Sequence, residues 1–426
     1  MPPGNAVTDD AVEHGLTETQ APPPTAETAP QRRVSSSPNG FPTVDHTNAD
    51  KPEPYPDRIE PVREPLSSSA THLYTLSYLV FFSIFGTLAR LGLQALTFYP
   101  GAPVVTGVLW ANVGGSLIMG FLLEDKNIFR EEWGTPRKST TSDDPSTESA
   151  RHKTTKKTIP LYIGLTTGFC GSFTSFSSFI RDIFLALSND LADPSRPSNT
   201  PSPRHGGYSV MSVLAVLLTQ VSLSLSALIF GSHLALALDR FLLPPTLPFR
   251  ITRKVIDPLF AFLAWGCWIG STFLAIFPPE NNWRGRAVFA IIFAPLGCLL
   301  RFYLSALNTR IPSFPLGTFA VNIFGTIILA MCYDLQHVDG IGSSSSSAAS
   351  ASASILVSCQ VLQGIMDGFC GSATTVSTWV SELNGLKRRL HAYVYGGVSV
   401  GVALAFFVVI SGSLRWTIGF GTAVCE

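Results

Sequence analysis

The sequence GFCGSFT at residues 168–174 returns almost unchanged as GFCGSAT at residues 368–374. Each copy lies in an apolar segment and is followed by residues rich in Ser and Thr. Glycines and hydroxyl side chains can interrupt a membrane helix, and in lipid an interruption is tolerated only where the freed backbone groups meet protein, water or an ion. The repeat therefore predicts a duplicated membrane protein with a broken helix in each half.

The duplication extends well beyond this motif, as an internal repeat should. Upstream, GTLAR ends at Arg90 and GCLLR ends at Arg301. An apolar, glycine-bearing segment with one Asn comes next, Asn112 in the first half and Asn322 in the second. One more apolar segment closes each half, so the repeated unit contains four hydrophobic segments.

The composition also predicts a membrane protein. Hydrophobic residues make up 46% of the chain and charged residues 14%, and the mean hydropathy is +0.29, whereas average usage includes about 25% charged residues. Crossing roughly 30 Å of hydrocarbon takes about 20 mostly apolar residues. Nine segments meet this requirement, at residues 73–98, 103–123, 160–187, 208–238, 256–277, 286–307, 313–334, 355–382 and 391–413.

The odd number of segments decides the topology. Residues 256–277 lack the repeat motifs and lie between the halves. A four-helix unit begins and ends on the same side of the membrane, so one extra crossing inverts the second unit. We therefore predict an all-α membrane protein with nine transmembrane helices, in which a single linking helix joins two inverted four-helix repeats. The predicted domains are a disordered cytosolic tail at 1–70, the first repeat at 71–240, the linker with the fifth transmembrane helix at 241–284, and the second repeat at 285–426.

The charges of the loops predict the orientation. Most Lys and Arg residues between the segments fall in loops that are inside if the N-terminus is cytosolic, above all at residues 124–158. By the positive-inside rule, the N-terminus is then cytosolic and the C-terminus external. The first 70 residues are rich in Pro, Ser and Thr, which is typical of a disordered tail.

Other classes of function find little support. The seven cysteines form no CxxC pair and no metal-binding pattern, so we interpret them as small buried hydrophobes. We find no Ser/His/Asp or paired-carboxylate constellation and predict that the chain is not an enzyme. No basic patch interleaved with aromatic residues suggests nucleic acid.

These motifs resemble the CrcB-like or Fluc fluoride channels. The resemblance rests on GTLAR, on the apolar segment with Asn112, and on GFCGSFTSFSSF at residues 168–179, and it covers roughly residues 73–413 apart from the linking helix. The two-domain form with a ninth helix resembles the eukaryotic fluoride exporters called FEX. The resemblance implies a monomeric fluoride channel in the plasma membrane, because the two subunits of the dimeric relatives are fused in one chain.

The resemblance implies that each Asn faces the fluoride path, although the residues alone equally allow an interhelical hydrogen bond. Phe176 and Phe179 share a helix face, where electropositive ring edges can contact an anion; without the resemblance they are core or lipid-facing aromatics. The predicted pore residues are Asn112, Phe176, Ser177, Phe179, Asn322, Thr375, Ser377, Tyr395 and Ser399.

The second half departs from the pattern, because Val376 and Trp379 occupy the positions of the two phenylalanines. This asymmetry suggests a single conducting pathway. The family carries a row of hydroxyl side chains, the hydroxyl track, on the last helix of the repeat. Tyr395 and Ser399 match this track in the second half, whereas Gln220 and Ser224 of the first half align with it only loosely. How the halves combine in the pore stays open at this point.

A structural Na⁺ is implied by the resemblance, held by the backbone carbonyls of Gly171, Thr174, Gly371 and Thr374. The alternative is a helix kink packed by small residues. Arg90 and Arg301 are costly within a membrane. We place both in an aqueous vestibule, with pairing to Asp182 or Glu382, or capping of a broken helix, as alternatives.

The predicted function is passive export of F⁻ across the plasma membrane, which confers fluoride resistance. Neutral HF enters from acidic surroundings and dissociates inside, and the negative membrane potential drives the anion out. Fluoride and the lipid bilayer are the expected partners. A proton-coupled small-solute antiporter, for which Asp367 is the feature of interest, and a membrane scaffold without transport are the alternatives.

Overall fold

The computed structural model of the chain describes residues 68–102, 104, 106–129, 154–196, 199–202, 204–241, 247–248, 251–278, 284–343 and 353–425. Almost all of the predicted tail lies outside these residues, so its disorder stays a prediction. Within the described residues every named element is helical, and the only β-bridges are isolated.

The helices follow the chain in two similar series. The first contains α1 (Ser68–Thr97), α2 (Val108–Glu124), α5 (Pro160–Ile163), η1 (Gly164–Cys170), α6 (Gly171–Phe173), α7 (Phe176–Ser188) and α8 (Gly206–Phe241). Between the series lie η3 (Thr252–Ile256) and α10 (Asp257–Ile276). The second contains η4 (Arg284–Val288), α12 (Phe289–Leu304), η5 (Ser305–Thr309), α13 (Leu316–Gln336), α14 (Ala353–Gly364), η7 (Ile365–Cys370), α15 (Gly371–Ala373), α16 (Ser377–Gly385) and α17 (Arg389–Thr417).

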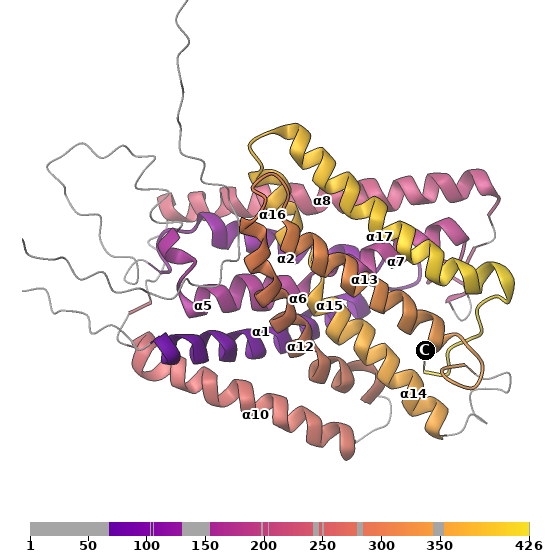
Figure 1. Cartoon of the computed structure of the whole chain (residues 1–426), viewed down its shortest axis with the longest axis horizontal. Coiled ribbons are helices and arrows are strands. Elements are labelled where there is room, and N and C mark those ends of the chain that lie inside the picture. The colour runs from indigo at the N-terminus through magenta and orange to yellow at the C-terminus, as the bar shows by residue number, and fades with distance from the viewer. Residues whose placement is uncertain are drawn as a thin grey trace, which may run out of the picture.

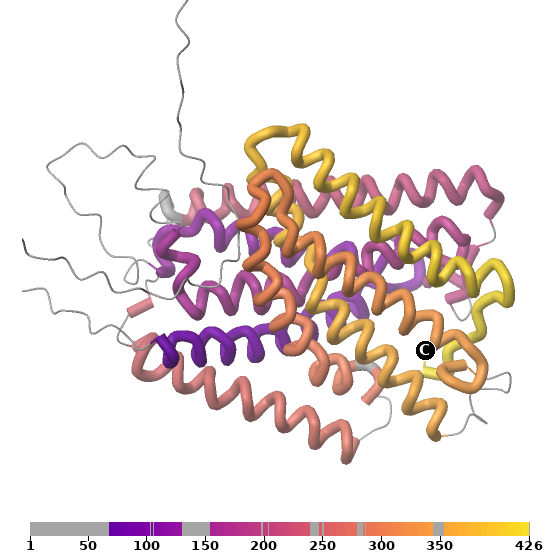
Figure 2. The backbone as a smooth tube through the Cα atoms, in the orientation of Figure 1, coloured from indigo at the N-terminus to yellow at the C-terminus, as the bar shows by residue number. Residues whose placement is uncertain are grey.

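The chain is a multi-pass membrane protein. Among the residues that the structure describes, seven helical stretches are long and apolar enough to cross a membrane. Two further predicted spans are present in shorter pieces, since α2 has 17 residues and the segment from α5 to α7 is interrupted. The long helices lie roughly along one direction, as spanning helices should (Figures 1 and 2).

The predicted helix breaks are present in both copies of the repeated motif. Thr174 and Ser175 are extended, with φ −97°, ψ 153° and φ −142°, ψ 116°, and Thr374 has φ −93°, ψ 149°. The turns before each break are π-helical, in η1 and η7. Ser175 then starts α7 as its N-cap, because its hydroxyl accepts a hydrogen bond from the Ser178 amide at 3.2 Å.

Glycine in the GTLAR and GCLLR motifs brings each first helix against its own break. A Cβ on Gly86 of α1 would lie 2.6 Å from the Phe169 carbonyl oxygen, and one on Gly297 of α12 would lie 2.2 Å from that of Phe369. Only a residue without a side chain allows this approach. The approach sets the arginine four residues later beside the break.

The two series interlock at their third segments. The half-helix α7 packs against α13 and α17 of the second series, and α16 packs against α2 and α8 of the first. The largest cluster of buried apolar side chains includes residues of both series. The breaks therefore meet in the middle of the molecule.

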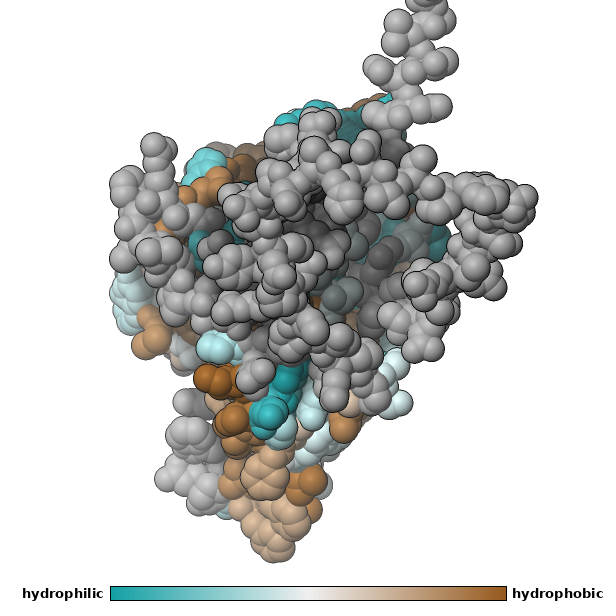
Figure 3. Space-filling view, turned by 90° about the vertical axis from the view of Figure 1, so that its left-hand side faces the viewer, coloured by the Kyte–Doolittle hydropathy of each residue, from teal (hydrophilic) through white to brown (hydrophobic). Residues whose placement is uncertain are grey.

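The linking helix α10 lies at the edge and packs on α1. It exposes large apolar side chains, among them Phe262 at 76% and Phe273 at 60%, as expected of a helix facing lipid. Figure 3 shows apolar side chains gathered at the bottom of the left-hand face, where α10 lies in Figure 1.

A disulfide joins Cys359 of α14 to Cys425 near the C-terminus. This corrects the interpretation of all seven cysteines as small buried hydrophobes. The two residues are 66 positions apart, and no local spacing pattern connects them.

Candidate functional site at the crossing of the two helix breaks

Each break is held by a threonine of the other. Thr174 Oγ1 accepts hydrogen bonds from the amides of Val376 and Ser377, both at 3.2 Å. Thr374 Oγ1 accepts from the Ser177 amide at 3.0 Å. These amides belong to the first turns of α16 and α7, so each half-helix is capped by the opposite half of the chain.

A cluster of buried hydroxyls completes the crossing. Thr174 Oγ1 lies 3.1 Å from Thr375 Oγ1 and 3.2 Å from Ser377 Oγ. Ser177 Oγ lies 3.0 Å from Thr374 Oγ1. The predicted pore residues Ser177, Thr375 and Ser377 therefore all lie at the crossing, where each bonds to the break threonine of the opposite half.

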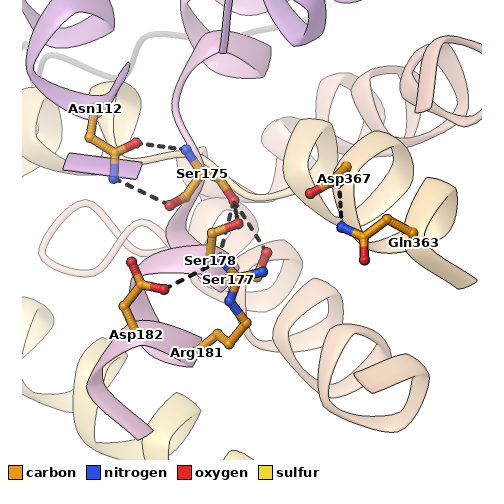
Figure 4. Close-up of polar contacts among 8 residues, drawn as sticks. All are labelled: Asn112, Ser175, Ser177, Ser178, Arg181, Asp182, Gln363 and Asp367. Atoms are coloured by element: carbon orange, nitrogen blue, oxygen red, sulfur yellow. Dashed lines mark hydrogen bonds and ion pairs between the residues drawn. The ribbon is translucent and has the colours of Figure 1, made fainter. Parts of the chain in front are cut away.

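The two asparagines clamp the unwound backbone. Asn112 Oδ1 accepts from the Ser175 amide at 2.8 Å, and its Nδ2 donates to the Ser175 carbonyl at 3.4 Å (Figure 4). Asn322 makes the same pair of bonds in the second half: its Oδ1 accepts from the Thr375 amide at 2.9 Å, and its Nδ2 donates to the Thr375 carbonyl at 3.3 Å. These are the interhelical hydrogen bonds that the sequence left open as an alternative, and they use the oxygen and one of the two N–H groups of each amide.

Arg90 and Arg301 do not lie in a vestibule. Their exposed fractions are 1% and 3%. Arg90 donates to the carbonyls of Ser172 at 2.9 Å and Gly371 at 2.7 Å, and also to that of Asp367. Arg301 donates to the carbonyls of Thr167 at 2.6 Å and Ser372 at 3.0 Å. The structure therefore corrects the vestibule prediction in favour of the capping alternative, because each guanidinium satisfies carbonyls that the helix breaks leave free.

The predicted sodium ligands do not fit Na⁺ in this arrangement. The Gly371 carbonyl already accepts a hydrogen bond from Arg90. A Cβ on Gly171 would lie 2.2 Å from the Arg301 guanidinium nitrogens, so a second cationic group stands at the same crossing. A metal ion sharing these carbonyls would be repelled by both guanidinium groups in a poorly solvated interior.

Three aromatic rings meet beside the crossing. Phe176 and Phe179 are edge to face with ring centroids 5.8 Å apart, and Phe176 and Trp379 are edge to face at 5.3 Å. All three are at most 1% exposed. A Cβ on Gly396 of α17 would lie 3.8 Å from Cζ2 of Trp379. The equivalent position to Phe176 holds Val376, so the rings gather on the Phe176 side.

A buried carboxylate anchors the hydroxyl track of the second half. Glu382 accepts from Tyr395 Oη at 2.6 Å through Oε2, and from Thr318 Oγ1 at 2.6 Å and Asn308 Nδ2 at 3.1 Å through Oε1. Ser399 Oγ donates to the Tyr395 carbonyl at 2.7 Å. The sequence reasoning missed Thr318 and Asn308 as partners; an acidic residue inside an apolar span was the signal that such donors must exist.

The described part of the first half contains no such network. Gln220 Nε2 and Ser224 Oγ are buried without a hydrogen-bond partner among the described residues. Asp182, the counterpart of Glu382, accepts from Arg181 at 3.3 Å (Figure 4). Both residues line a cavity of about 340 Å³ whose wall also includes Gln94, Gln363 and Asp367. Arg181 was not among the predicted site residues.

The fold and this crossing define a multi-pass membrane protein with two interlocked broken helices. The chain belongs to the family described as CrcB-like protein, Camphor Resistance (CrcB), whose model matches residues 77–232 and 288–412.

Curated relatives extend this assignment. The chain is 54% identical over 387 residues to fluoride export protein 1 of Neurospora crassa, covering 85% of this chain and 70% of that protein. It is 37% identical over 341 residues to fluoride export protein 1 of Candida albicans, covering 79% of each. A 97-residue stretch is 37% identical to the fluoride-specific ion channel FluC of Geotalea daltonii, covering 22% of this chain and 66% of that protein. No solved structure matches the chain.

Proposed function

We propose that the chain is a fluoride-selective channel that exports F⁻ passively across the plasma membrane through one conducting pathway. The names of its relatives, fluoride export protein and fluoride-specific ion channel, support the ion and the direction.

The chemistry of the crossing suits a small anion, and the observation that carries the proposal is the placement of the two arginines. A halide path needs hydrogen-bond donors and electropositive ring edges without a free fixed cation that would hold the ion too tightly. Arg90 and Arg301 both donate to carbonyls of the breaks. Uncharged hydroxyls and aromatic edges remain beside the crossing.

The conducting pathway runs where α7 meets α13 and α17. This side combines Phe176 and Phe179 of the first half with Asn322, Tyr395 and Ser399 of the second. The opposite side, where α16 meets α2 and α8, has Val376 in place of the first phenylalanine and lacks the Tyr395 hydroxyl. Each half thus lacks a different part of the pore lining, and only one side of the crossing has both the phenylalanines and the hydroxyl track.

The nine-helix inverted repeat is part of the proposal. In Figure 1, α8 runs from right to left and α17 from left to right, although both close their series. The linking helix α10 supplies the odd crossing. The disulfide between Cys359 and Cys425 supports an external C-terminus, since disulfides form in oxidising compartments. The distribution of loop charge supports the same orientation. We propose that the fused chain works as a monomer.

Transport needs no energy source besides the membrane potential. An anion that dissociates from HF inside the cell is driven outward by a negative interior, at about 2.3 kcal/mol per charge and 100 mV. A structural Na⁺ at the crossing stays a prediction, and its binding has to overcome repulsion by the guanidinium groups of Arg90 and Arg301.

The test is anion release from liposomes that hold the purified protein, with potassium inside and valinomycin as the trigger. We expect rapid release of fluoride and no release of chloride above protein-free liposomes. Equal release of both anions would refute fluoride selectivity.

A proton-coupled antiporter is the second candidate, and one observation favours it. Asp367 lines the cavity and accepts a hydrogen bond from Gln363 Nε2 at 2.6 Å through Oδ2 (Figure 4). An antiporter predicts release that needs a pH gradient and stops in Asp367→Asn. A channel predicts release in that variant without any gradient.

A further inference from the structure

Trp379 carries a buried N–H group with no hydrogen-bond partner among the described residues. The side chain is 1% exposed. Indole nitrogen is a donor only, and a buried indole usually finds an acceptor. Two other tryptophans follow this rule, since Trp265 Nε1 donates to Ser77 Oγ at 3.2 Å and Trp268 Nε1 donates to the Ile292 carbonyl at 2.9 Å. Trp379 therefore departs from what the same chain does elsewhere.

Although Trp379 belongs to α16, which otherwise packs on α2 and α8, its indole ring reaches the Phe176 end of the proposed pathway. The Trp379 ring meets Phe176 edge to face at 5.3 Å. The indole ring lies near α17, because a Cβ on Gly396 would lie 3.8 Å from Cζ2, the six-membered-ring carbon that is two bonds from Nε1. Gly396 directly follows Tyr395, which bears a hydroxyl of the track. The donor thus lies where α7, α16 and α17 come together.

A contact with the Phe176 ring is the alternative within the protein. An N–H group pointing at an aromatic face gains little compared with a hydrogen bond to oxygen or to an ion. Such a contact would leave the donor weakly satisfied and available to a stronger acceptor. Fluoride, the smallest halide and a strong hydrogen-bond acceptor, is such a partner.

We propose that the Trp379 indole N–H donates a hydrogen bond to fluoride as the ion passes the ring of Phe176. The inference rests on the proposed fluoride channel. A neutral donor binds an anion without the tight hold of a fixed cation, which suits an ion that must leave again. The counterpart in the first half, Phe179, offers a ring edge but no N–H group. Trp379 thus supplies a hydrogen-bond donor that Phe179, at the equivalent position of the first half, does not.

The sharpest test replaces Trp379 by benzothienylalanine, an isostere in which sulfur takes the place of the N–H group. We expect valinomycin-triggered fluoride release to fall about tenfold, which corresponds to about 1.4 kcal/mol. The same replacement of Trp268, on the linking helix, is the matched control and should release fluoride at the wild-type rate. A folded Trp379 isostere that releases at the wild-type rate would overturn the inference. A wild-type protein that releases no fluoride would instead defeat the proposed function.

The contact between the indole N–H group and fluoride can also be measured by NMR, without any transport. In protein labelled with ¹⁵N-indole, the Nε1–H resonance of Trp379 is assigned by its loss in Trp379→Phe. Adding sodium fluoride should move this proton signal downfield, and sodium chloride should leave it in place. An unmoved signal at saturating fluoride would show that the N–H group does not meet the ion.

Discussion

The guanidinium group of Arg90 donates to the carbonyl of Gly371 at 2.7 Å, across 281 positions of sequence. Arg301 makes the reciprocal contact with the first break through the Thr167 carbonyl at 2.6 Å. Each half of the chain thus supplies the cation that satisfies the helix break of the other half. The two halves depend on each other for the geometry of their breaks.

Gly371→Ala should disrupt this contact. A Cβ at this position would lie 2.3 Å to 2.5 Å from the Arg90 guanidinium atoms, which are themselves held by backbone carbonyls. We expect a loss of more than about 3 kcal/mol, because the buried charge would lose its partners. Thermal unfolding in detergent measures the effect. Gly266→Ala on α10, where nothing lies within 4 Å of the new Cβ, is the control and should leave the melting temperature unchanged or higher. Equal melting temperatures of the two variants would contradict a stabilising contact between Arg90 and the second helix break.

Thr174→Val should weaken the reciprocal caps. The change removes the oxygen that accepts from Val376 and Ser377. Loss of a helix N-cap costs about 0.5 to 2 kcal/mol. Thr174→Ser keeps the hydroxyl and should retain most of the stability in the same unfolding experiment. A Val variant as stable as the wild type, or a Ser variant less stable than the Val variant, would contradict the role of the cap.

Tyr395→Phe should slow fluoride release. The change leaves Glu382 Oε2 without the hydroxyl that now donates at 2.6 Å, and it removes one hydroxyl from the track. We expect a fall of about tenfold, since a hydrogen bond to a charged group is worth about 1.5 to 3 kcal/mol. Gln220→Leu, at the equivalent position of the non-conducting side, should have little effect. The reverse order of effects would assign conduction to the other side.

The disulfide provides a test of orientation. A membrane-impermeant maleimide applied to intact cells should label Cys425, which is partly exposed, only after mild reduction of its bond to the buried Cys359. Free cysteines such as Cys170 and Cys370 are buried and should not compete. Cys425→Ser should also lower the stability by about 2 to 4 kcal/mol, as loss of a native cross-link does. Labelling that appears only after the cells are permeabilised would place the C-terminus inside.

The sequence predicted the helical class and the positions of both breaks, because hydrophobic length and the glycine and hydroxyl pattern are local properties. It also singled out Asn112, Arg90 and their counterparts as unusual for lipid. It did not determine their roles. Arg90 reaches the second break only because Gly86 lets α1 approach the first, and that relationship exists only in the packed molecule.

Contacts between distant residues could not be predicted. The Phe176 and Trp379 pair joins α7 to α16, and the Glu382 network collects donors from three elements. Periodicity places a residue on a helix face but does not say which helix lies opposite. The disulfide escaped prediction for the same reason, since Cys359 and Cys425 share no motif.

The central claim is a single pathway for fluoride that uses Phe176. The measurement is fluoride release from potassium-loaded liposomes triggered by valinomycin, with Phe176→Ile and Val376→Phe beside the wild type. We predict that Phe176→Ile slows release at least tenfold and that Val376→Phe releases at the wild-type rate. A wild-type release rate in Phe176→Ile, or a changed release rate in Val376→Phe, would contradict a single pathway that uses Phe176.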